Sequence, residues 1–247
     1  MKIIYSELFK KFPEIVFGFS TKIGLNRKEP FYFNLSLTVG DDPDAVQTNR
    51  NVFFNALGLK KESVAIQKQI HSDIITIVNQ GGLIGQSDAM ITKQPNVGLA
   101  ISSADCVPIF IYNKKNGIIA GVHSGWRGTQ KQILKKTLYK LRDEFYSSPE
   151  NMFVFVGPSI SQMNYEIGKE VAELFNPQYC SFKEDKIFLD VAKINYDFLR
   201  EFGIPETNIE VSNLCSFDEK ELLHSYRRDG EKSGRAFGVI ALRGDSI

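Results

Sequence analysis

The stretch GIIAGVHSGWRGTQ, residues 117–130, joins an apolar strand pattern to the start of a helix within a few residues. Its first half is apolar and bounded by glycine, which is typical of a strand buried in a sheet. The strand pattern ends at His123, and Gly125 and Gly128 then flank the only tryptophan of the chain and Arg127. We therefore expect a fold of sheets and helices that places polar chemistry at a strand end, where sites are often built on a rigid scaffold.

Similar strand-like runs recur along the chain and outnumber the helical patterns. Many neighbouring runs are joined by short turns, which favours mixed sheets over a doubly wound parallel sheet. The expected fold class is therefore α+β, or α/β with mixed sheets. The strand-like runs are residues 14–20, 63–70, 74–78, 98–102, 107–112, 117–122, 152–157 and 237–242, and the helical patterns are residues 42–58, 130–145, 168–175 and 191–203.

The overall composition points away from nucleic acid and membranes as partners. The chain has 247 residues and a formal net charge of +1, so nothing in its charge balance matches a polyanion or a lipid surface. It has no apolar run near the roughly 20 residues that a membrane span needs, and its start lacks a signal-peptide pattern. Its three cysteines are widely spaced and do not resemble a secreted disulfide framework. We expect a cytoplasmic protein with reduced thiols, and the sequence does not indicate an oligomeric state.

Two histidines and one cysteine lie at strand ends or in tight connections between strand-like runs. They are His71, Cys106 and His123. Each alone is more typical of a structural residue, but two imidazoles and a thiolate form a three-ligand set that leaves a fourth position of Zn²⁺ open for water or substrate. The spacing is too long for a zinc finger or ribbon. Cys180 and Cys215 show no comparable pattern, and we interpret both as structural.

Arginines cluster in two places. Arg127 lies where the strand turns into a helix, and such a helix start beside a guanidinium can bind an anion. Arg227, Arg228 and Arg235 follow the third histidine, His224, in a glycine-containing loop. A solvated charged loop is the simpler interpretation for one such cluster, but two clusters in a nearly neutral chain favour a phosphate or carboxylate on the substrate.

Several motifs taken together resemble the laccase-domain family, also called the polyphenol oxidase or YfiH/YlmD family. The resemblance covers almost the whole chain, and it implies one four-layer α/β/β/α domain with mixed β-sheets over residues 1–247. It also implies a metal site at His71, Cys106 and His123. Lys22 departs from the arginine of the family pattern, which puts an anion contact at that edge in doubt. The motifs are, in order, GFSTK, VGDDPDAVQTNR, QIHS, DAMIT, ADCVPIFIYN, AGVHSGWRGT, GPSISQMNYEIG and SYRRDGEKSGRAFGVIAL.

The activity that this resemblance implies is zinc-dependent phosphorolysis of the purine nucleosides adenosine, inosine, guanosine and methylthioadenosine, with adenosine deamination as a second activity. Arg127, Arg227 and Arg228 are then candidates for binding phosphate or substrate. Asp105 and Glu166 are candidate proton carriers at the site, and Glu166 is also a candidate substrate-binding residue.

Two other activities use the same residues. Two histidines and a cysteine also resemble a blue-copper set, so Cu²⁺ and phenol oxidation are an alternative. A laccase needs several coppers, however, and three histidines cannot ligate them all. A metal-free hydrolase with Cys106 as nucleophile and a histidine as base is a further alternative.

Overall fold

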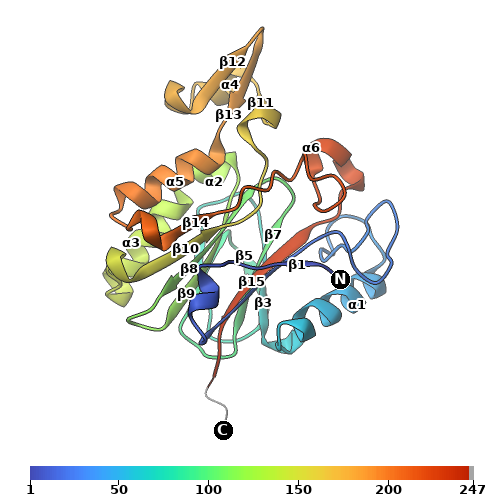
Figure 1. Ribbon diagram of the computed structural model, residues 1–247, viewed down its shortest axis with the longest axis vertical. Helices are drawn as coiled ribbons and strands as arrows, with labels where there is room; N and C mark the ends of the chain where they lie inside the picture. Colours follow the sequence, from blue (N-terminus) through green and yellow to red (C-terminus); the bar gives the residue numbers. More distant parts are fainter. Residues whose placement is uncertain (245–247) are drawn as a thin grey trace.

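The centre of the protein consists of two six-stranded β-sheets (Figure 1). We describe residues 1–244 in a computed structural model of the chain. The first sheet has the strand order β1 (Ile3–Ile4), β2 (Ile15–Ser20), β15 (Ala236–Leu242), β7 (Gly98–Ser103), β3 (Val64–Lys68) and β5 (Gly82–Gln86). The second has the order β14 (Ile209–Val211), β10 (Met152–Val156), β8 (Val107–Asn113), β9 (Ile118–Ser124), β6 (Ala89–Thr92) and β4 (Ile75–Ile77).

Both sheets are mixed, as expected. In the first, β3 runs parallel to β5 and β7, while β15 is antiparallel to both of its neighbours. In the second, the outer pairs β10–β14 and β4–β6 are parallel and the central strands are antiparallel. Every strand-like run of the sequence forms a strand, because alternating or continuous burial of β-branched and aromatic side chains stabilises these segments in a sheet.

The two sheets pack face to face through an aromatic core. Phe17 of β2 contacts Phe110 of β8 and Phe155 of β10 at ring-centroid distances of 5.0 and 5.1 Å. The sheets approach so closely that a Cβ at Gly238 would lie 2.2 Å from the ring of Phe110. This interior therefore joins the sheets into one packed unit.

Helices cover the two outer faces. Helix α1 (Pro43–Ala56) packs on the first sheet, and α3 (Ile133–Phe145) and α5 (Val191–Glu201) pack on the second. This arrangement confirms the four-layer α/β/β/α architecture. The expectation of one domain over residues 1–247 stays a prediction, and its last three residues lie outside the described part.

Two of the expected helices differ clearly in their bounds from the observed ones. The helix expected at residues 130–145 is split into α2 (Trp126–Gln130) and α3, with Gln132 between them at a left-handed φ of 62°. The short α2 continues directly from β9, whereas α3 begins at Ile133, the first residue of its buried face. The chain has to change direction between these two packing positions, and that is where the helix breaks.

A small third sheet projects from the second-sheet side of the molecule (top of Figure 1). It has the order β11 (Glu166–Ile167), β13 (Lys186–Leu189) and β12 (Cys180–Lys183), and all its pairs are antiparallel. The helix expected at residues 168–175 is only the short α4 (Lys169–Ala172) of this module. A last short helix, α6 (Tyr226–Asp229), lies close to the root of the module. No helix within residues 1–244 is long and apolar enough to span a membrane.

Candidate metal centre

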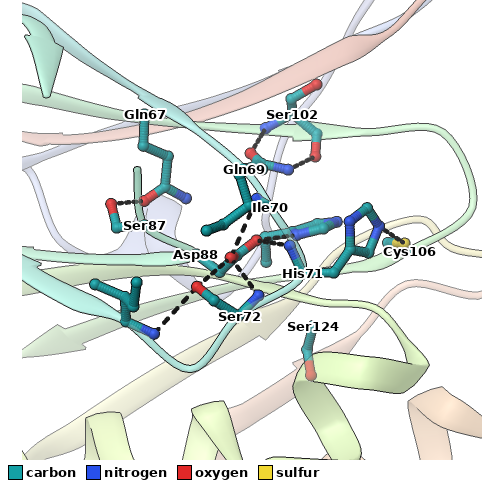
Figure 2. Close-up of polar contacts among 12 residues, drawn as sticks. Gln67, Gln69, Ile70, His71, Ser72, Ser87, Asp88, Ser102, Cys106 and Ser124 are labelled. Atoms are coloured by element: carbon teal, nitrogen blue, oxygen red, sulfur yellow. Dashed lines mark hydrogen bonds and ion pairs between the residues drawn. The ribbon is translucent and has the colours of Figure 1, made fainter. Parts of the chain in front are cut away.

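Three side chains from distant parts of the sequence converge at one end of the two sheets. The donor atoms of His71, Cys106 and His123 all lie within 4.8 Å of one another. Figure 2 shows His71 reaching Cys106, with 3.9 Å between Nε2 and Sγ. The rings of the two histidines meet edge to face with 4.9 Å between their centroids. The sequence prediction that these residues could form one ligand set therefore has direct geometric support.

The strand register explains why Cys106 and His123 meet. Strands β8 and β9 are antiparallel neighbours in which Val107 is paired with Ser124 and Pro108 with His123. Cys106, immediately before β8, is thereby brought beside the end of β9. His123 itself is a β-strand residue, so its imidazole leaves the sheet in a fixed direction.

His71 reaches the same point from the first sheet through a tight turn after β3. Its backbone is left-handed, with φ at 57°, a conformation that non-glycine residues rarely adopt. The strain is compensated by Asp88, whose carboxylate accepts hydrogen bonds from the backbone N–H groups of Ile70, His71 and Ser72 at 3.3, 3.1 and 2.6 Å.

Asp88 is the site residue that the sequence interpretation missed. It is fully buried, and its carboxylate also binds Nδ1 of His123 at 2.8 Å. The same carboxylate accepts a hydrogen bond from the Ser72 hydroxyl at 2.6 Å (Figure 2). One carboxylate thus holds the turn of His71 and the ring of His123 together. The only sequence signal was an aspartate directly before the buried run of β6, in the motif DAMIT.

The ionisation state of the thiol suits metal binding, whereas His123 has to lose a proton to ligate a metal. Burial lowers the pKa of His123, but Cys106 and Asp88 outweigh burial and raise this pKa to about 9. Burial alone raises the pKa of the Cys106 thiol, but the imidazoles of His123 and His71 outweigh burial and lower this pKa. Burial likewise raises the pKa of Asp88, and hydrogen bonds from His123 and Ser72 reverse the effect and bring it to about 2. The site therefore favours a thiolate, the form that binds metals.

Gly125 leaves open the space that the donors surround. A Cβ built on this residue would lie 2.7 Å from Sγ of Cys106 and 3.2 Å from Cδ2 of His71. The glycine is needed for room and not for its backbone conformation, because its φ of −76° and ψ of 176° are open to any residue. The space between the donor side chains therefore explains why the residue after the end of β9 is a glycine.

These features fit a catalytic zinc ion. The chain offers two imidazoles and a thiolate, as three-ligand zinc sites do. Since Nδ1 of His123 is bound to Asp88, its Nε2 is the nitrogen free to ligate, and such a carboxylate support is typical of metal-binding histidines.

Arg127 stands beside the centre as an exposed cation. It follows Trp126 at the start of α2, and its guanidinium stacks over that indole with 4.3 Å between Cζ and the ring centroid. Trp126 packs half-buried against the outer core. Among the described residues the guanidinium has no hydrogen bond or ion pair, so it is available to an anion.

Asp105 connects the turn of Cys106 to the loop of Arg227. Its backbone is left-handed, with φ at 97°, and one carboxylate oxygen accepts the N–H of Arg227 at 2.6 Å. The other accepts a hydrogen bond from Ser216 at 2.6 Å. The Arg227 guanidinium donates to a carbonyl of β11 at 2.7 Å and stacks over Tyr165 at 4.9 Å.

Two predicted substrate residues are engaged in other contacts. Arg228 makes five hydrogen bonds, to carbonyls within residues 216–223 and to Asp229, which match the five N–H donors of a guanidinium. The exposed carboxylate of Glu166 binds Lys186 at 2.9 Å. Their predicted contact with substrate stays a prediction.

The third histidine lies apart from the centre. His224 is buried, with 3% of its surface exposed, and does not belong to the convergent donor group. Burial lowers its pKa to about 3, so it is neutral, and its Nε2 has no hydrogen-bond partner in the described structure. The centre therefore has two imidazoles at most.

Comparison with known proteins agrees with this geometry. Residues 16–243 match the family model described as multi-copper polyphenol oxidoreductase laccase. A purine nucleoside phosphorylase of Bacteroides thetaiotaomicron is 33% identical over 228 residues, covering 85% of this chain and 84% of the relative. Another, of Clostridium acetobutylicum, is 34% identical and covers 96% and 95%.

The fold has solved counterparts. The YfiH protein of Bacillus licheniformis, described as hypothetical, superposes with a TM-score of 0.92 at 27% identity, over 98% of this chain and 96% of that one. YlmD of Geobacillus stearothermophilus gives 0.90 at 28% identity, over 97% and 94%. The chain belongs to the laccase-domain (multi-copper polyphenol oxidoreductase laccase) family.

Proposed function

We propose that this protein is a zinc-dependent purine nucleoside phosphorylase. It cleaves adenosine, inosine, guanosine and methylthioadenosine with phosphate, releasing the purine and the 1-phosphate of the ribose or methylthioribose. The observation that carries the proposal is a three-donor metal centre next to an unengaged arginine, in a chain whose relatives bear that name.

The residues divide between metal and anion. His71, Cys106 and His123 hold the ion, which supplies a Lewis acid and lowers the pKa of a bound water. Arg127 and Arg227 bind phosphate on one face of the ribose, where its oxygen forms a bond to C1′ as the bond from C1′ to the purine nitrogen breaks. That bond breaks through a sugar with oxocarbenium character, so a nearby dianion stabilises the transition state.

Asp105 and Arg228 support these groups. Both oxygens of the Asp105 carboxylate accept hydrogen bonds, one of them from the N–H of Arg227. These contacts favour a positioning role for Asp105 over proton transfer. Arg228, with its guanidinium engaged by its own loop, fixes the position of the neighbouring Arg227.

Adenosine deamination is proposed as a second reaction of the same centre. In this reaction water adds at C6 of the adenine ring and ammonia leaves, and a metal held by His71, Cys106 and His123 would supply the Lewis acidity that makes such a water nucleophilic. Because both reactions need the same three donors, loss of His123 should remove both.

The donor set supports the copper alternative less well than it supports a single zinc ion. A laccase needs a trinuclear copper cluster with several imidazoles besides its blue-copper site. Of the three histidines of the chain, His224 is buried away from the centre. Cu²⁺ bound at the triad could support weak phenol oxidation, but not the multicopper reaction.

The Cys–His hydrolase remains the second candidate because the lowered pKa of Cys106 also favours a nucleophilic thiolate. Removal of zinc separates the two: phosphorolysis by the metal centre should stop with a chelator and return with Zn²⁺, whereas a metal-free thiol enzyme should be unaffected.

Product analysis tests the proposal. Zinc-loaded protein should convert each nucleoside to its base only when phosphate is present, and chromatography should show the sugar 1-phosphate in equal amount. The His123→Ala variant should be inactive, and Cys106→Ala should bind no zinc. A zinc-loaded wild-type protein that leaves all four nucleosides unchanged but oxidises phenols with O₂ would overturn the proposal.

A further inference from the structure

Tyr165 lies at the root of the projecting module, directly before β11. Its ring is half-buried against the outer core of the second sheet, and its backbone carbonyl accepts the N–H of Leu189 at 3.1 Å. One side of the ring carries the guanidinium of Arg227, 4.9 Å from the centroid. Arg227 is itself tied by its N–H to Asp105, the residue before Cys106. A chain of direct contacts thus links Tyr165 to the metal centre.

Burial and nearby charges both act on the Tyr165 hydroxyl. Burial raises its pKa most, and Cys106 and Asp105 raise it further, while Arg227 and Arg127 lower it. The contact that places these charges in space is the guanidinium of Arg227, which lies over the Tyr165 ring. The net rise keeps it protonated at neutral pH, so it can donate a hydrogen bond.

This hydroxyl makes no hydrogen bond within residues 1–244, and it is not among the unpartnered side-chain atoms that are sealed from solvent, so a ligand can reach it. Burial and the Asp197 carboxylate raise the pKa of Tyr179, the other half-buried tyrosine of the module. Packing explains the position of the Tyr165 ring, but no protein contact explains the position of its hydroxyl. A free donor on a ring that carries the Arg227 guanidinium suits an anionic oxygen, which forms shorter and stronger hydrogen bonds than a neutral one.

We propose that the Tyr165 hydroxyl is a third phosphate-binding group, which donates to a phosphate oxygen held between Arg127 and Arg227. The inference rests on the proposed function for the identity of the anion. Arg227 is held in place for this task, because its guanidinium is fixed by the carbonyl of Glu166 and by the tyrosine ring.

Tyr165→Phe is the matched test, because it keeps the ring that packs and stacks and removes only the hydroxyl. Inorganic phosphate alone is titrated into zinc-loaded protein by calorimetry, with Tyr179→Phe as a control in the same module. We expect Tyr165→Phe to weaken phosphate binding roughly tenfold or more, as for loss of a hydrogen bond to a charged group. Tyr179→Phe should leave phosphate binding unchanged, and thermal unfolding of Tyr165→Phe should match wild type.

Steady-state kinetics gives the second measurement. The KM for phosphate should rise in Tyr165→Phe while the KM for the nucleoside stays the same. Equal phosphate affinity in wild type and Tyr165→Phe would overturn the inference, and so would a rise confined to the nucleoside KM or a wild-type protein that binds no phosphate. Because the titration needs no turnover, a protein that binds phosphate through Tyr165 without cleaving nucleosides would refute the proposed function and leave this inference standing.

Discussion

Gly125→Ala is the sharpest test of the metal centre, since it adds one methyl group to the space between the donors. The new Cβ would lie 2.7 Å from Sγ of Cys106 and 3.2 Å from Cδ2 of His71. Comfortable carbon contacts are about 3.5–4.0 Å, so the thiol has to move by roughly 1 Å. Metal sites tolerate shifts of only about 0.2 Å in their ligand distances. We expect zinc affinity to fall at least about 100-fold, the upper end of the losses seen when only a supporting contact is removed.

The effect on folding should be much smaller. Overpacking costs about 1–3 kcal/mol, and the lower chain entropy of alanine in the unfolded state offsets about 0.4–1 kcal/mol of that cost. For a chain of this size the net change corresponds to a fall in Tm of less than about 10 °C. A folded protein that has lost its metal is therefore the expected result.

Gly128→Ala is the matched control in the same turn. Its Cβ would meet only Cγ2 of Ile133 at 3.2 Å and two carbonyl oxygens at 3.5 Å, and none of the three donor side chains. Competition titration with a chromogenic chelator measures zinc affinity, and calorimetry measures Tm. If Gly125→Ala binds zinc as tightly as wild type, the space it fills is not where the ion sits, and the reasoning fails.

Three further predictions concern Asp88 and Arg127 at the centre and His224 in the interior. Asp88→Asn should lower zinc affinity about 10- to 100-fold, as for loss of a carboxylate that supports a ligating histidine, and wild-type affinity would contradict this. Arg127→Ala should raise the KM for phosphate about tenfold, with the nucleoside KM unchanged, since one charge-assisted hydrogen bond is lost; an unchanged phosphate KM would make Arg127 structural. Burial lowers the pKa of His224 from 6.5 to about 3, so below pH 6.5 the unfolded chain binds a proton that the folded chain does not. The free energy of unfolding should then fall by up to about 1.4 kcal/mol per pH unit as the pH drops toward 3. Urea unfolding of His224→Gln should show a shallower pH dependence, and equal slopes would refute the assignment.

The strands and the three donors could be predicted because each corresponds to a short, local pattern of residue types in the sequence. Buried strands such as β8 and β9 are continuous apolar runs bounded by polar turns, and their length excludes a long helix. Cys106 and His123 stand at the ends of these runs, where a polar residue in an apolar context is conspicuous. Histidine and cysteine are also few in this chain, which narrows the possible donor sets.

Positions that depend on contacts between distant segments could not be predicted. The break at Gln132 follows from how α2 and α3 each pack, and nothing in the helical period marks it. The sequence also does not show that the Arg228 guanidinium donates hydrogen bonds to its own loop, whereas the Arg227 guanidinium stacks over Tyr165. Both arginines are adjacent, and only the fold distinguishes them.

Asp88 shows why the support of a site is harder to find in a sequence than its ligands. A carboxylate that accepts backbone N–H groups resembles any aspartate in a turn or at a helix start. Its role arises only where three segments meet: the turn at residues 70–72, the start of β6 and the end of β9. Buried and ionised, it fixes the left-handed turn of His71 and determines which nitrogen of His123 is free. The geometry of the centre is therefore a property of the two-sheet scaffold, which orders the donors through hydrogen bonds that need no ion.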